Sequence, residues 1–286
     1  MSQIEIYKAI ADAEAASAVV GAEVVSPFTI EVRFLGGLTQ RQIDAFTGAA
    51  DRWVGLIVGD LPSVTLPGGQ VVDDLLIFAR GEDIDGEGNV LGQAGARELR
   101  PANAGQFAFL PATGEMSFDI ADLERMEDDG TLNDVITHEM GHVLGVGRQI
   151  WRRKSLLQGE GSSDPTFRGA RAIEEYARLR GGEQVPVPVA NVGGPGTRDT
   201  HWREAVFVNE LMTGTIREAG NPISRMTVGS LADLGYVVNI NAAEPYELPD
   251  LLVVAERGLL VTVEDPVNAG MMLPTVPMVL PQGSLL

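Results

Sequence analysis

The chain has 286 residues, 44% of them hydrophobic, and contains no cysteine. This length can bury a sizeable core in one large domain or two subdomains. The 21 Lys and Arg residues and 40 Asp and Glu residues give a formal net charge of −19, which argues against nucleic acid and anionic membranes as partners. The absence of cysteine excludes disulfides, thiolate metal ligands and a cysteine-based zymogen lock, but it does not fix the compartment.

The first part of the chain predicts a helix, a strand and a long helix. Residues 1–20 are rich in alanine and are expected to be helical until Ser26-Pro27 breaks the pattern. Residues 28–34 alternate apolar and polar side chains, which is typical of a half-buried strand. Thr39 is a good N-cap for a helix over about residues 40–57, where apolar side chains recur at helical spacing.

The middle of the chain predicts an interior strand and a hairpin. Residues 71–79 are mostly apolar and are expected in the interior of a sheet, followed by an acidic, glycine-rich loop over residues 81–95. Residues 106–110 and 115–118 flank a Pro-Ala-Thr-Gly turn, which is a hairpin signal. A short helix is expected over residues 119–126.

Three further helices are expected. Thr131 caps a helix that runs through His138 and His142 and stops at Gly145. After this helix the chain becomes richer in glycine, proline and polar residues, with helices expected over about residues 169–180 and 224–234.

The segment His138-Glu139-Met140-Gly141-His142 indicates a metal site. Residues four apart lie on one face of a helix, so His138 and His142 can direct two imidazoles at one point. Glu139 then lies beside a water bound to the metal, and a catalytic zinc needs one more protein ligand and an open position. The same pattern also occurs on amphipathic helices without a metal, so alone it leaves both readings open. The one other histidine of the chain is His201.

The extension of this segment to Gly145 resembles the metzincin metallopeptidases. Their usual pattern has a third histidine three residues after that glycine, where this chain has Arg148. Leishmanolysin and its bacterial relatives instead carry a long insertion before the third ligand, and the chain resembles this family over most of its length. The segments that carry the resemblance are Gly114-Glu115-Met116-Ser117-Phe118-Asp119, His138 to Gly145, Gly193-Gly194-Pro195-Gly196-Thr197, His201-Trp202-Arg203-Glu204, Asn209-Glu210-Leu211-Met212-Thr213-Gly214, Ser224-Arg225-Met226-Thr227 and Leu231-Ala232-Asp233-Leu234-Gly235-Tyr236.

The resemblance implies a set of site residues. His138, His142 and His201 would hold one catalytic zinc ion, and Glu139 would be the general base. Met212 would lie in a Met-turn beneath the zinc as an apolar floor that does not coordinate. Leishmanolysin itself is cysteine-rich and membrane-anchored, whereas this chain has no cysteine and no anchor signal, so disulfide stapling, a cysteine switch and surface anchoring do not transfer.

The resemblance also implies an α+β, metzincin-like fold. Residues 1–147 would form an upper subdomain with a twisted mixed sheet, a backing helix and the active-site helix. Residues 148–250 would form a lower, irregular subdomain with the third ligand, the Met-turn and a C-terminal helix. Residues 251–286 would form a tail that either packs on the domain or serves as an uncleaved C-terminal export signal.

Three other segments leave alternatives open. Glu174 and Glu175 are candidate third ligands, although the residue pattern around them is typical of the solvated face of an amphipathic helix. Residues 83–89 alternate oxygen-bearing side chains, which suits either Ca²⁺ or a solvated acidic loop. Residues 106–110 form either the edge strand that pairs with an extended substrate or a plain core strand.

The sequence therefore predicts a soluble zinc endopeptidase that hydrolyses peptide bonds through a zinc-bound water activated by Glu139. The alternatives are a narrow-specificity or non-proteolytic zinc hydrolase and a non-catalytic zinc-binding module on the same fold, and Glu139 argues against the module. The expected partner is a peptide or protein substrate, with no nucleic acid and no membrane insertion. Secretion without a cleavable N-terminal signal and a cytoplasmic location both stay open, and the oligomeric state is not indicated.

Overall fold

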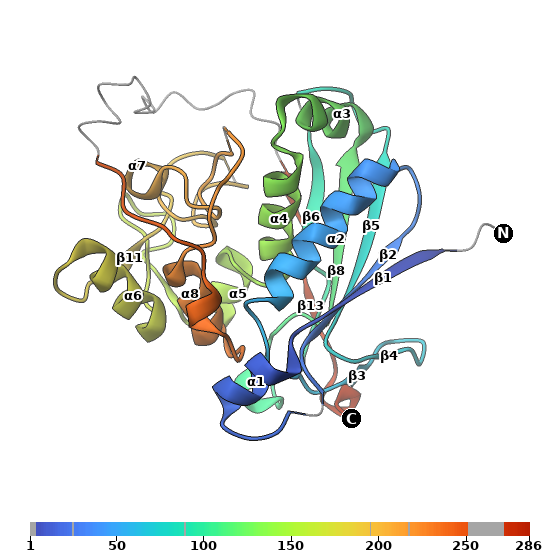
Figure 1. The fold of residues 1–286 in the computed structure, drawn as a ribbon, viewed down its shortest axis with the longest axis horizontal. Coiled ribbons are helices and arrows are strands. Elements are labelled where there is room, and N and C mark those ends of the chain that lie inside the picture. The colour runs from blue at the N-terminus through green and yellow to red at the C-terminus, as the bar shows by residue number, and fades with distance from the viewer. Residues whose placement is uncertain (1–3, 25, 89, 195, 217, 251–271) are drawn as a thin grey trace.

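The structure is a computed structural model of the chain, and it describes residues 4–24, 26–88, 90–194, 196–216, 218–250 and 272–286. One half of the molecule holds the large sheet and three of the longer helices, and the other half holds shorter helices and small strands (Figure 1). The elements of the first half are β1 (Glu5–Ile10), α1 (Ala13–Val20), β2 (Thr29–Phe34), α2 (Gln40–Val54), β3 (Val64–Thr65), β4 (Val71–Val72), β5 (Leu75–Glu82), β6 (Gly92–Ala96), β7 (Glu98–Leu99), the 3-10 helix η1 (Gly105–Phe107), β8 (Thr113–Asp119), α3 (Ile120–Asp129) and α4 (Leu132–Val143). The elements of the second half are α5 (Arg148–Arg153), β9 (Leu157–Gln158), β10 (Thr166–Phe167), α6 (Ala170–Arg180), β11 (Val187–Pro188), α7 (Glu204–Phe207), α8 (Arg225–Leu234) and η2 (Ile240–Ala242). The C-terminal elements β12 (Met272–Pro274), β13 (Met278–Val279) and η3 (Gln282–Ser284) return to the sheet half.

The large sheet is mixed and has the order β1-β2-β5-β8-β6-β12. Strands β2, β5 and β8 are parallel to one another, β1 is antiparallel to β2, β6 is antiparallel to β8, and β12 is parallel to β6. Phe46 of α2 contacts Phe34 and Phe118 of the sheet edge-on, with ring centroids 5.9 Å apart in both pairs. The indole of Trp53 in α2 donates to the Thr137 carbonyl of α4 at 3.0 Å. Helices α2 and α4 therefore pack side by side on the sheet, α2 against β1 and β2 and α4 against β6 and β8.

The expected helix over residues 1–20 is wrong for its first part, because residues 5–10 form strand β1. Their buried and half-buried side chains, Ala9 and Tyr7, alternate with exposed ones, and the whole segment pairs with β2. Because the segment is rich in alanine, its sequence suggested a helix and did not show the alternation that is typical of a strand. Asp12 then accepts from the backbone N–H of Ala15, so the helix begins only at Ala13. Residues 1–3 lie outside the described part of the chain.

The expected hairpin of residues 106–110 and 115–118 is also wrong. The first segment contains η1 and a residue with φ of 66°, Phe109, and strand β8 pairs instead with β5 and β6. Strand β6 lies in part of what was expected to be loop. Its sequence Gly-Gln-Ala-Gly-Ala has only small side chains besides Gln93, so it carries no apolar alternation for a pattern to detect.

The longer helices α2, α6 and α8 confirm the helical periodicity within a few residues. The expected strand over residues 71–79 is divided into β4 and β5 at Asp74, a buried carboxylate that accepts from the backbone N–H groups of Thr29 and Leu61. Thr131 stands at the start of α4, but its side chain bonds Asp129 and does not cap the helix.

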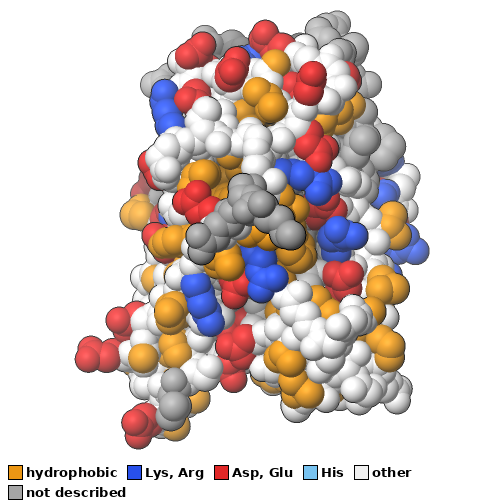
Figure 2. Space-filling view, turned by 90° about the vertical axis from the view of Figure 1, so that its right-hand side faces the viewer, with side chains coloured by type: hydrophobic (Ala, Val, Ile, Leu, Met, Phe, Trp, Pro, Cys, Tyr) orange, Lys and Arg blue, Asp and Glu red, His pale blue; other side chains and the backbone are white. Residues whose placement is uncertain are grey.

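The acidic excess does not produce a uniformly acidic surface on the side of the molecule where the N-terminus lies. Figure 2 shows basic side chains beside acidic ones across the middle of this face. In the described part of the chain, no helix has both the length and the apolar character needed to cross a bilayer.

Candidate metal centre

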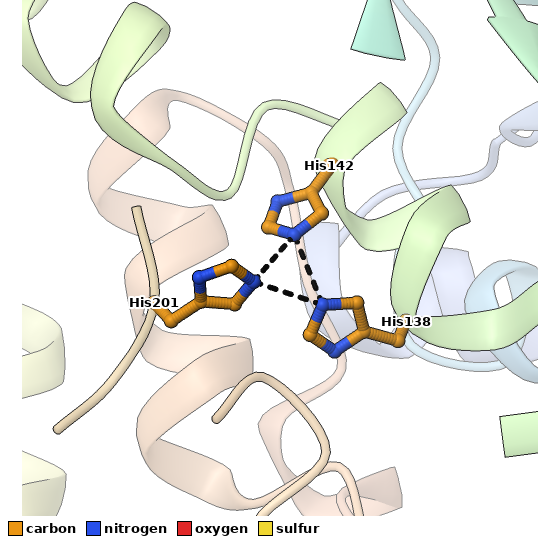
Figure 3. A group of neighbouring side chains, drawn as sticks. All are labelled: His138, His142 and His201. Carbon is orange, nitrogen blue, oxygen red and sulfur yellow. Dashed lines mark hydrogen bonds between the residues drawn. The ribbon is translucent and has the colours of Figure 1, made fainter. Parts of the chain in front are cut away.

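Three histidine side chains converge on one point. His138 and His142 extend from successive turns of α4, and His201 comes from the segment before α7 (Figure 3). Their Nε2 atoms lie 3.0 Å apart in all three pairs. His138 and His201 are each only 6% exposed. The structure thus brings together the three histidines that the sequence singled out, in a group that could hold a metal ion.

Each of these rings is oriented by a backbone carbonyl. The Nδ1 atoms lie 2.6 Å from the Leu211 oxygen for His138, 2.7 Å from the Val146 oxygen for His142 and 3.0 Å from the Thr197 oxygen for His201. A carbonyl oxygen can only accept, so each Nδ1 carries the proton. In the neutral rings each Nε2 is therefore left with a lone pair, which is the form of imidazole that binds metals.

The three lone pairs face one another with no donor between them. Burial lowers the pKa of His138 well below its usual range, with repulsion from the other two rings adding to the effect. Burial likewise lowers the pKa of His142 to about 4 and, with repulsion from His142, the pKa of His201 to about 3. Extra protons are thus disfavoured, and a cation is the natural partner. Tetrahedral zinc, with Zn–N bonds of about 2.0–2.1 Å, places its nitrogen ligands roughly 3.3 Å apart, so the group fits this ion.

Glu139 follows the first of these histidines and is 6% exposed. Burial raises the pKa of its carboxyl group to about 8. Within the described residues, no hydrogen bond or ion pair holds this carboxyl group. Glu139 is therefore a buried acid with no structural partner beside a candidate metal site, a combination typical of functional groups.

His201 is placed by its neighbour in the chain. The Trp202 ring stacks on Trp151 with centroids 5.0 Å apart, and its indole N–H donates to the Thr227 hydroxyl at 2.8 Å. The Trp202 backbone N–H donates to the Met212 carbonyl at 2.9 Å. Because Trp202 is fully buried, these contacts with α5, α8 and Met212 hold the loop that carries His201 in place.

Met212 packs beneath the same helix. A Cβ atom added to Gly141 would lie 2.7 Å from the Met212 sulfur and 3.0 Å from the Trp53 ring. Met212 is fully buried, so its thioether fills the space that the glycine leaves open. The glycine inside the HExxH segment is thus required by the close approach of Met212.

Glu210 is a buried residue that the sequence reading did not single out as a site residue. One carboxylate oxygen accepts from the Met212 backbone N–H at 2.7 Å. The other accepts from the Ser224 backbone N–H at 3.1 Å, the Ser224 hydroxyl at 2.7 Å and the Thr227 hydroxyl. These bonds satisfy a carboxylate that would be costly to bury alone, and they fix the segment whose Leu211 carbonyl orients His138. Its one sequence signal is an acid next to the apolar pair Leu211-Met212.

The other candidate ligands lie elsewhere. Glu175 pairs with Arg225 at 2.9 Å and Glu174 pairs with Arg178 at 2.6 Å, so both serve ion pairs of α6 and the alternative third ligand has no support. Around the expected calcium loop, the backbone N–H groups of residues 84–86 point at the Asp119 carboxylate. In the described part of that loop no three acidic side chains converge, and calcium stays a prediction.

Replacing Gly141 with alanine is expected to lower the free energy of unfolding by about 1–3 kcal/mol, because the new methyl group overlaps Met212 and Trp53. Thermal unfolding of the zinc-loaded protein measures this loss. The matched control is Gly48→Ala in α2, where an added Cβ meets no atom within 4 Å and helix propensity favours alanine. Equal melting temperatures for the two variants would contradict the close packing of Gly141 against Met212 and Trp53.

The sequence model of the leishmanolysin family matches residues 106–248, which is half of the chain. The matched region includes the three converging histidines, Glu139 and Met212. The chain therefore belongs to the leishmanolysin family of metallopeptidases. Peptidases of this family are in general zinc-dependent, and the mixed α+β architecture is compatible with a metzincin-like fold. No curated protein matches the chain.

Proposed function

We propose that this protein is a zinc-dependent endopeptidase in which His138, His142 and His201 hold the ion and Glu139 acts as general base. The observation that carries the proposal is the convergence of three Nε2 lone pairs beside a buried, unpaired acid. Membership of the leishmanolysin family supplies the class of reaction. An acid without a structural partner has no evident use in a purely structural zinc site, and this favours an enzyme over a binding module.

When bound, the zinc ion supplies Lewis acidity: it polarises the scissile carbonyl and lowers the pKa of a coordinated water to about 7. Glu139 takes a proton from the attacking water and later delivers it to the nitrogen of the leaving amine. Glu139 is buried directly beside the proposed ligand His138, so its carboxylate is placed to hold that proton until the amine leaves. The Leu211, Val146 and Thr197 carbonyls hold the imidazoles in the tautomer that presents Nε2.

Met212 is proposed as the apolar floor of this site. Support comes from its complete burial and from its contact with Gly141, one residue before His142. Glu210 is proposed as the clamp that holds the backbone of this turn, since it accepts from the Met212 N–H. Neither residue is expected to touch the substrate.

Removal of zinc is expected to stop peptide cleavage. Purified protein is incubated with a peptide library of mixed sequence, and the products are identified by mass spectrometry. Chelation with 1,10-phenanthroline should reduce the cleavage rate at least roughly 100-fold, because the reaction loses its Lewis acid, and one equivalent of Zn²⁺ should restore it. The same amount of Ca²⁺ is the control and should restore nothing. Cleavage that survives chelation, or a zinc-loaded protein that cuts no library peptide, would contradict the proposal.

A further inference from the structure

One arginine side chain in the last turn of α2 joins three separate parts of the chain. Nη1 of Arg52 donates to Oδ1 of Asp134 at 3.2 Å and to the Thr137 hydroxyl at 3.4 Å, both in α4. Nη2 donates to the Asn221 carbonyl at 3.1 Å, and Nε and Nη2 donate to the two carboxylate oxygens of Glu244 at 3.1 and 2.9 Å. All five N–H groups of the guanidinium therefore have acceptors, and the side chain is only 29% exposed.

The acids that Arg52 pairs with hold the backbone of residues 220–223, the segment that leads into α8. Asp134 accepts from the backbone N–H groups of the first two of these residues. Glu244 accepts from the backbone N–H of the last one at 2.7 Å, and its own backbone N–H donates to the carbonyl of that residue at 3.0 Å. Arg52 and its two acids therefore fix the chain on both sides of Pro222.

The Pro222 carbonyl connects this segment to one of the converging histidines. It accepts from the Leu211 backbone N–H at 2.9 Å, and the Leu211 carbonyl in turn lies 2.6 Å from Nδ1 of His138. Leu211 is therefore the single residue between the clamped segment and the His138 ring. Because the group that bonds Nδ1 fixes the tautomer and orientation of an imidazole, a displaced Pro222 carbonyl would change how Nε2 is presented.

The end of α2 also contacts the residue that precedes His138 in α4. Thr137 is 1% exposed; its hydroxyl accepts from Arg52 at 3.4 Å, and its carbonyl accepts from the indole of Trp53 at 3.0 Å. Helix α2 runs beside α4 along this contact (Figure 1). Arg52 thus reaches His138 by two routes, through the backbone of its own helix and through the carbonyl that orients its ring.

We propose that Arg52 is a positioning residue of the metal centre, which fixes the Pro222 carbonyl and through it the His138 ring without touching the ion or a substrate. The inference rests on the proposed function, in which His138 is a zinc ligand. The family model matches residues 106–248, so it does not include Arg52. A lysine could not replace it, because an ammonium has three donors on one nitrogen and cannot bond both oxygens of Glu244 and the other acceptors together.

Replacing Arg52 with alanine is expected to weaken zinc binding about tenfold, the lower end of the loss that follows removal of a group behind a metal ligand. The affinity is measured by titration of the full chain against a competing zinc chelator. The matched control is Arg125→Ala in α3, which removes a guanidinium that is 38% exposed and whose partners are Asp122, Asp129 and Glu87. This control should bind zinc like the parent.

Free guanidinium separates positioning from a general loss of stability. Adding about 20 mM guanidinium chloride, far below the molar concentrations that unfold proteins, should raise the zinc affinity of Arg52→Ala by at least about threefold, because the free cation can bond the same acceptors. It should leave the parent and Arg125→Ala unchanged. The same nitrogen site also binds Co²⁺, whose visible absorption depends on ligand geometry. The absorption bands of Co²⁺-loaded Arg52→Ala should differ from those of the parent and return toward them with guanidinium.

A second variant, Arg52→Lys, covers the case in which the alanine variant does not fold. It keeps the charge but supplies three donors for five acceptors, so it should bind zinc at least about threefold more weakly than the parent. Parental zinc affinity in either folded Arg52 variant, an equal loss in Arg125→Ala, or a loss in Arg52→Ala that guanidinium does not reduce would overturn the proposal. Cleavage of library peptides is measured separately. A parent that binds zinc but cuts nothing would refute the peptidase function and leave the role of Arg52 standing.

Discussion

Replacing Glu139 with glutamine is expected to abolish peptide cleavage and leave the metal in place. Glutamine keeps the size of the side chain but cannot carry a proton from water to the leaving amine. General acid–base catalysis contributes about 10²–10⁴-fold, so kcat/KM should fall by a factor in that range. The measurement uses a peptide identified from the library, with zinc content determined by atomic absorption. Zinc should remain at the parental level, because the three imidazoles that converge on the site are unchanged.

The control for this substitution is Glu174→Gln in α6. The sequence offered Glu174 as a candidate third metal ligand. In the structure it pairs with Arg178, and its side chain is 36% exposed. Cleavage by this variant should equal cleavage by the parent. If Glu139→Gln retained near-parental kcat/KM, another group would have to handle the proton and the proposed mechanism would fail. If it lost its zinc as well, Glu139 would be part of the metal site and not the base.

The convergence of His138 and His142 was predictable from sequence because one helix determines it. Four residues make about one turn, so the spacing alone places both imidazoles on one face. The position of His201 follows from no local rule. It depends on Trp202 stacking on Trp151 and bonding the Met212 carbonyl, contacts between residues far apart in the chain. The resemblance to a family supplied this histidine, and periodicity could not have done so.

Strand β6, in contrast, was not predictable from the sequence. Alternation of Phe107 and Phe109 with Ala108 favoured a strand over residues 106–110, but these side chains pack against the core from a 3-10 turn. Strand β6, which pairs with β8 in the sheet, consists mainly of glycine and alanine, which give no signal at a period of two. Its pairing with residues 272–274 is also invisible locally, since the partners are separated by most of the chain. A strand is predicted from sequence by large apolar side chains at every second position, and β6 has no such side chains.

The support behind the ligands was equally hidden from the sequence. Three backbone carbonyls orient the imidazoles, and a carbonyl carries no residue identity that a motif could record. Glu210 fixes one of those carbonyls through bonds to Met212, Ser224 and Thr227. Since such groups hold the ligand rings in place, their geometry affects metal affinity as well as stability. A motif therefore identifies candidate ligands, while long-range packing determines how well their rings are oriented.

Replacing His201 with alanine is expected to weaken zinc binding more than about 100-fold. Loss of a group that only hydrogen-bonds a metal ligand already lowers metal affinity by about 10–100-fold. His201 supplies one of three converging nitrogens, and the two left on α4 cannot complete a catalytic site. The affinity is measured by titration against a competing zinc chelator. By mass action, added zinc should also raise the melting temperature of the variant less than that of the parent.

The control for His201→Ala is Glu175→Gln, which alters the rejected third-ligand candidate and weakens only its ion pair with Arg225. This variant should bind zinc like the parent. Circular dichroism of the metal-free proteins separates loss of affinity from loss of fold, since His201→Ala leaves the buried Trp202 and its contacts in place. Parental zinc affinity in a folded His201→Ala protein would show that the ion lies elsewhere, and the assignment of three imidazoles to one zinc would then be wrong.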